Sequence, residues 1–247
     1  MQKRLRPGLT EALAGLALCS ALAAAAADPP EEPKVAATLT LASPDFYVGM
    51  AQPEAPSHAL ALTLAYFPAA GWTPQLIVDT ARTAARLLAQ CGVLVSALEV
   101  HRIEGGPRYA YYATARSREL ARRIPLKRPA VYFVADTLQR PAFEAEAVGR
   151  ANSGSRPELA DTVWVTRGAR DLGIVLAHEL VHVLMDSGEH VDEPGNLMQD
   201  ETDPRNTRLE ASQCARLRET GTAHGLLTPP RRAHCCVLTA HLGSRSS

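Results

Sequence analysis

The chain has 247 residues, equal numbers of acidic and basic residues, and 46% hydrophobic residues. This length and composition suit one globular domain with tails. The balanced charge excludes the strongly basic class of nucleic-acid-binding proteins, so we expect no nucleic-acid partner.

Residues 1–27 have the pattern of a secretory signal peptide. A basic stretch precedes an apolar run that ends in small residues, which predicts cleavage near Ala27. Two alternatives are an N-terminal membrane anchor, for which the apolar run is short, and a lipoprotein modified at Cys19. We expect a secreted or periplasmic protein with no stable membrane insertion after cleavage. The basic residues are Lys3, Arg4 and Arg6.

The rest of the chain divides by composition into three parts. Residues 28–57 are rich in proline and are predicted to be an extended leader. Residues 58–221 carry periodic patterns and are predicted to be the main folded domain, on which the catalytic residues described below lie, whereas 222–247 form a weakly patterned tail. The predicted strands are 58–67, 93–103, 129–137, 146–152 and 161–166, with a polar, arginine-rich connection before the third.

Three helices are predicted between and after these strands. The first begins after Thr73, a good N-cap, and ends at Gly92. The second covers 169–188 and ends near Gly188, and the third covers 208–221. The order of elements predicts an α+β fold, in which a twisted mixed sheet packs on helices and a smaller C-terminal part follows.

The second predicted helix carries the pattern H-E-x-x-H at His178, Glu179 and His182. Residues four apart share a helix face, so both imidazoles can bind one Zn²⁺ ion. Glu179 is then placed to act as general base toward a water that the ion activates. The alternative is a chance pentapeptide, but a glutamate and two histidines on an apolar, buried helix need partners.

Two residues compete to be the third protein ligand. His190 follows Gly188, which we expect to break the helix and turn the chain back toward the ion. Asp186 lies one turn past His182, but a third ligand on the same straight helix gives a poor tetrahedron. We therefore favour His190 and interpret Asp186 as a supporting or helix-end group.

From His178 onward the sequence resembles the metzincin clan of zinc peptidases. That clan combines H-E-x-x-H with a glycine turn, a third ligand and a tight turn containing methionine, which Met198 in "GNLM" matches. Met198 could also be ordinary core filler. The usual third-ligand position holds Gly188, so His190 comes two residues late, and no tyrosine follows Tyr132 to stabilise an oxyanion.

These residues predict a zinc metalloprotease that hydrolyses peptide or protein substrates with one catalytic Zn²⁺. One alternative is a zinc amidase acting on cell-wall peptide, and another is a non-catalytic, secreted zinc-binding domain. Glu179 argues against the last, because a purely structural site needs no acid beside its ligand. Residues 28–57 contain no cysteine, so they cannot place a thiolate on the metal.

Export would allow disulfides to persist. We predict a bond between Cys91 and Cys214, because both lie in well-patterned helical segments. Cys235 and Cys236 are adjacent in the tail and make poorer partners. The sequence leaves the oligomeric state and the cleavage specificity open.

Overall fold

A computed structural model describes residues 32–230 of the chain. Its strands are β1 (Lys34–Ala42), β2 (His58–Tyr66), β3 (Val93–Glu104), β4 (Tyr111–Tyr112), β5 (Ala130–Phe133), β6 (Asp136–Thr137), β7 (Ala145–Val148), β8 (Thr162–Val165) and β9 (Leu227–Thr228). Its α-helices are α1 (Ser43–Phe46), α2 (Pro74–Leu88), α3 (Thr114–Arg123), α4 (Leu172–Met185) and α5 (Ala211–Ala223). Four short 3₁₀ turns are η1 (Pro68–Ala70), η2 (Ala89–Cys91), η3 (Pro107–Ala110) and η4 (Pro157–Leu159).

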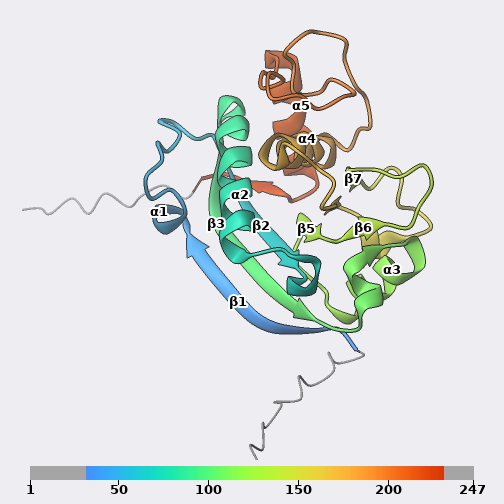
Figure 1. Ribbon diagram of the computed structural model, residues 1–247. Coiled ribbons are helices and arrows are strands. Elements are labelled where there is room, and N and C mark those ends of the chain that lie inside the picture. The colour runs from blue at the N-terminus through green and yellow to red at the C-terminus, as the bar shows by residue number, and fades with distance from the viewer. Residues whose placement is uncertain (1–31, 231–247) are drawn as a thin grey trace, which may run out of the picture.

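A twisted, mixed sheet forms the centre of the fold (Figure 1). The strand order is β1-β3-β2-β5-β8-β7, and β9 also pairs with β2. The strands β3, β2, β5 and β8 are parallel to one another, whereas β1, β7 and β9 each pair antiparallel with one of them. The predicted α+β class, with a mixed sheet and packed helices, is confirmed.

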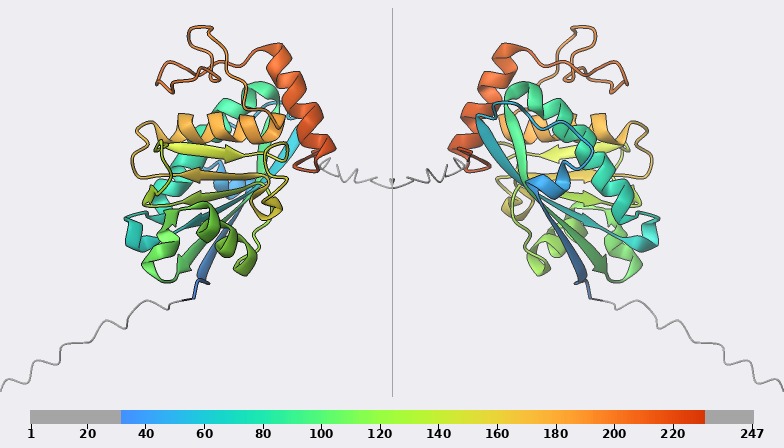
Figure 2. Two further views of the ribbon diagram at one scale, coloured as in Figure 1. Left: turned by 90° about the vertical axis from the view of Figure 1, so that its right-hand side faces the viewer. Right: turned by 90° about the vertical axis from the view of Figure 1, so that its left-hand side faces the viewer.

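Side chains on the two faces of the sheet belong to two separate hydrophobic clusters. Along β5, Val131 and Phe133 enter the cluster under α2 and α4, whereas Ala130 and Tyr132 enter the cluster under α3. This alternation follows from the two-residue repeat of a strand. Figure 2 shows α2 and α4 on one face of the sheet and α3 on the other. The long helix α4 is therefore held between the sheet, α2 and α5.

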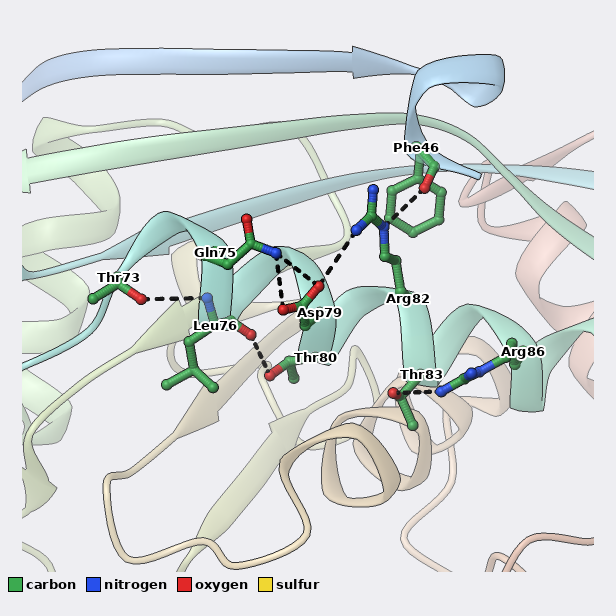
Figure 3. Close-up of polar contacts among 9 residues, drawn as sticks. All are labelled: Phe46, Thr73, Gln75, Leu76, Asp79, Thr80, Arg82, Thr83 and Arg86. Atoms are coloured by element: carbon green, nitrogen blue, oxygen red, sulfur yellow. Dashed lines mark hydrogen bonds and ion pairs between the residues drawn. The ribbon is translucent and has the colours of Figure 1, made fainter. Parts of the chain in front are cut away.

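Helix α2 begins at the predicted residue but ends at Leu88, and the 3₁₀ turn η2 continues the chain to the predicted stop at Gly92. The Thr73 hydroxyl accepts a hydrogen bond from the Leu76 N–H at 3.3 Å, and Gly92 adopts φ 70° beyond the helix. Side chains on its exposed face pair along the helix (Figure 3). Arg82 also donates to the Phe46 carbonyl at 3.0 Å, which ties α1 to α2.

Two segments outside the predicted catalytic domain join the sheet. Residues 34–42, within the predicted leader, form edge strand β1 against β3, and Phe46 of α1 is fully buried. The composition hid this strand because nearly every β1 residue is exposed, so no buried face marks it. Residues 227–228, within the predicted tail, form β9. The predicted signal peptide and the pair Cys235–Cys236 lie outside the described residues.

The arginine-rich connection contains a helix that the sequence analysis did not predict. Its arginines lie on the solvated face of α3, where Arg118 and Arg122 pair with Glu158. Within residues 32–230, no helix has the length and apolar character needed to cross a membrane.

Candidate metal centre

Helix α4 supplies the two histidines of the H-E-x-x-H pattern. Its residues from Ile174 to Met185 are all buried, and only 3% of His178 and 8% of His182 are exposed. The four-residue spacing places both rings on one side of the helix, where their Nε2 atoms lie 2.9 Å apart.

Backbone carbonyls orient both rings. The Nδ1 of His178 lies 2.7 Å from the Leu197 oxygen, and the Nδ1 of His182 lies 2.6 Å from the Ser187 oxygen. A carbonyl only accepts, so each Nδ1 carries the proton and each neutral ring presents a lone pair at Nε2. Burial lowers the pKa of His178 and lowers the pKa of His182 to about 4. The rings are therefore neutral at neutral pH.

His190 completes the group from the loop that follows α4. Its Nε2 lies 3.1 Å from that of His182 and 3.3 Å from that of His178. Its Nδ1 lies 3.2 Å from an oxygen of Asp200, which places that carboxylate beside the ring. Within residues 32–230, these histidines are the one group of three potential ligands found close enough to share an ion.

The chemistry of this group fits a metal ion. The three Nε2 atoms converge on one point, and those of His178 and His182 meet there as two lone pairs that repel each other. A divalent cation at that point removes the repulsion. Three nitrogens bound tetrahedrally at ~2.0–2.1 Å lie roughly 3.3 Å apart, which is close to the observed separations of 2.9–3.3 Å. The protein can thus hold one metal ion with three histidines.

Glu179 lies beside the histidines but outside this group. Its side chain is buried, and burial raises its pKa to about 8, although a hydrogen bond from the Ala147 N–H lowers it. Ala147 belongs to β7, so the carboxyl lies between α4 and the edge of the sheet. A divalent cation nearby would favour the carboxylate and lower the pKa again.

The turn containing Met198 packs beneath the histidines. Gly195 opens it at φ 79°, and Leu197 and Met198 are buried to at least 99%. The Met198 N–H donates to the Asn196 side chain at 2.9 Å, and the Met198 oxygen accepts from the Val191 N–H at 2.9 Å. The same turn therefore supports His178 through its Leu197 carbonyl.

The helix break differs from the prediction. Asp186, and not Gly188, adopts the left-handed conformation that ends α4, at φ 47°. Aspartate tolerates this conformation because its short polar side chain can bond locally. Its Oδ1 accepts from the Ala151 N–H at 2.9 Å, which ties the end of α4 to the loop after β7. The Asp186 carboxylate is therefore engaged away from the three nitrogens.

An open cleft of about 740 Å³ lies over the histidines. Its lining includes residues of β7 and of the loop that follows it, together with residues 200–204. The floor comes from α4, with His178, Glu179 and His182 all lining the cleft. Because β7 is the last strand of the sheet, its outer edge is available for pairing beside Glu179.

The Cys91–Cys214 disulfide is present and joins η2 to α5. Asp200, Asn196 and Gln213 were missed by the sequence analysis. Gln213 left a weak signal, because it stands three residues after Glu210 in a capping box at the start of α5. The contacts of Asp200 and Asn196 have no signal in the sequence, because they depend on how the loop folds back.

No protein-family model and no curated protein matches the sequence. Among solved structures, the chain is similar to the crystal structure of metalloproteinase-II from Bacteroides fragilis, with a TM-score of 0.47 and 19% identity. The alignment covers 68% of this chain and 54% of that one, so this chain spans about half of that protein's length. The structure brings His178, His182 and His190 together, as the H-E-x-x-H…H pattern in the sequence predicts.

Proposed function

We propose that the protein is a zinc-dependent metallopeptidase that hydrolyses peptide bonds. The observation that carries this proposal is the convergence of three histidine Nε2 atoms beside a buried glutamate that lines the same open cleft. Three protein nitrogens leave the fourth tetrahedral position free, as in catalytic zinc sites. A structural site would use four protein ligands.

Zinc is the metal that this ligand set favours, and His178, His182 and His190 would hold it. When bound, Zn²⁺ lowers the pKa of water and polarises a carbonyl as a Lewis acid. Glu179 would accept the proton of the attacking water and pass it to the leaving amine. Its burial against β7 keeps bulk water from competing for that proton.

The cleft suits an extended peptide. A substrate segment can add to the open edge of β7 by main-chain hydrogen bonds, which would bring its carbonyl groups past Glu179. A strand-like binding mode favours a peptidase over an amidase of branched cell-wall peptide. Since no tyrosine follows Tyr132, an oxyanion would be stabilised by the metal, a backbone N–H or another side chain.

We further infer that the enzyme is a metzincin and that it is exported. His190 and the buried turn at Met198 support the first inference, because they add the clan's third ligand and methionine turn to H-E-x-x-H. The Cys91–Cys214 disulfide supports the second, since such bonds persist in oxidising compartments.

The test is the substitution Glu179→Gln, with metal content and turnover measured on the same sample. We expect zinc to remain bound while turnover on an unstructured protein falls roughly 10²–10⁴-fold, because only the base is lost. Wild-type turnover must also disappear with chelator and return with zinc. Undiminished turnover in the variant would refute the mechanism. Wild-type protein that cleaves only cell-wall peptide would indicate the amidase, and inactivity with bound zinc would indicate a binding domain.

A further inference from the structure

The turn beneath the histidines is attached to α5 by a pair of side-chain amides. Asn196 is 97% buried, and its Nδ2 donates to the Gln213 Oε1 at 3.1 Å. In return, the Gln213 Nε2 donates to the Asn196 Oδ1 at 3.3 Å. Each amide thus donates one hydrogen bond to the other, and two such bonds fix the turn more firmly than one would.

Asn196 passes this attachment to the backbone of the turn. Its Oδ1 also accepts from the Met198 N–H at 2.9 Å, so the side chain bridges Gln213 and the turn's own main chain. Leu197 lies between Asn196 and Met198 in the chain, and its carbonyl oxygen is 2.7 Å from the Nδ1 of His178. The position of that oxygen, and hence the direction of the His178 ring, depends on the bridge.

Gln213 is itself firmly placed. Its Oε1 accepts from the Glu210 N–H at 2.7 Å, as one half of the capping box that begins α5. The next residue is Cys214, which the disulfide joins to Cys91. Gln90, beside Cys91, accepts from the Leu209 N–H at 2.7 Å and donates to the Thr207 oxygen at 3.0 Å.

We propose that Gln213 is a positioning residue of the metal centre. It acts on His178 through Asn196 and the Leu197 carbonyl, and it holds the ring in the tautomer and direction that metal binding requires. This inference rests on the proposed function, because it assumes that the histidines bind Zn²⁺. It extends that function by making the N-terminus of α5 part of what sets metal affinity.

The experiment compares three variants of the full chain in their apo forms. Gln213→Ala removes both amide contacts to Asn196. Gln213→Glu keeps acceptors for the Asn196 and Glu210 donors and loses only the longer bond to the Asn196 Oδ1, so it is the partial rescue. Glu210→Ala removes the other half of the capping box and leaves the Asn196–Gln213 pair intact, so it controls for loss of α5 stability.

The readouts are Zn²⁺ affinity, by competition with a coloured chelator, and the visible absorption of Co²⁺ bound in place of zinc. We expect Gln213→Ala to weaken Zn²⁺ binding about tenfold, the lower end of the range for partners of metal ligands, and to change the Co²⁺ spectrum. Glu210→Ala should keep the wild-type spectrum and affinity, and Gln213→Glu should restore most of the affinity that Gln213→Ala loses. Wild-type affinity in Gln213→Ala, or an equal loss in Glu210→Ala, would overturn this inference alone. A wild-type chain that binds no Zn²⁺ would overturn the proposed function as well.

Discussion

His178 and His182 lie on a helix buried by the sheet and by two other helices, whereas His190 lies on an exposed stretch of the loop between α4 and α5. The first two rings are oriented by backbone carbonyls. The third has Asp200 as its ring partner, and 86% of that side chain is exposed. Two of the proposed ligands are thus prealigned by the core, and the third lies on an exposed part of the loop.

This difference gives the helix and the loop different energetic roles in metal binding. The helix pair costs little further ordering when a metal binds, because its rings are already held by packing. The loop must stay in place for His190 to reach the same point, and it is held by α5 through hydrogen bonds and by the disulfide behind them. The predictions below test whether metal binding and stability separate along this line.

The largest expected effect is the loss of metal on substitution of His190. We expect His190→Ala to lose Zn²⁺ affinity by more than the ~100-fold that removal of a ligand's partner can cost, and to lose activity with it. Asp186→Ala should keep most of the zinc, because its carboxylate bonds to the Ala151 N–H. Metal analysis of both purified variants checks this. The opposite pattern would make Asp186 the third ligand.

The next effect is loss of stability when the disulfide is removed. The bond spans 123 residues of sequence, and closing a loop of that size contributes about 4–5 kcal/mol in the chain-entropy model. We expect Cys91→Ser with Cys214→Ser to lower the free energy of unfolding by up to that amount in urea denaturation. Hydrogen exchange should rise first in α5 and residues 195–210. If α4 lost protection equally, the two regions would form one cooperative unit.

The smallest effect concerns the exposed partner of His190. We expect Asp200→Ala to weaken Zn²⁺ binding by about tenfold at most, because the carboxylate orients the ring but is well solvated. Glu201→Ala is the matched control, since Glu201 is exposed, lines the same cleft and has no ion pair with His190. Equal affinity in the two variants would show that Asp200 does not orient the ring.

Local patterns in the sequence determined much of this protein. Thr73 marked the start of α2 and Gly92 marked the stop after η2, runs of apolar residues marked β2 and β8, and the spacing of His178 and His182 placed two rings on one helix face. These features can be predicted from the sequence because they depend on helix and strand periods and on capping, which act between residues close in the chain.

Only the tertiary structure decided the rest. Strand β1 has no buried face in its own sequence and belongs to the sheet through its pairing with β3. Asp186 took the helix break expected at Gly188 because its carboxylate meets Ala151, a residue 35 positions away. The contacts of Asn196 with Gln213, and of His190 with Asp200, likewise form only when the loop folds back. Such pairings depend on distances between remote residues, which no local period encodes.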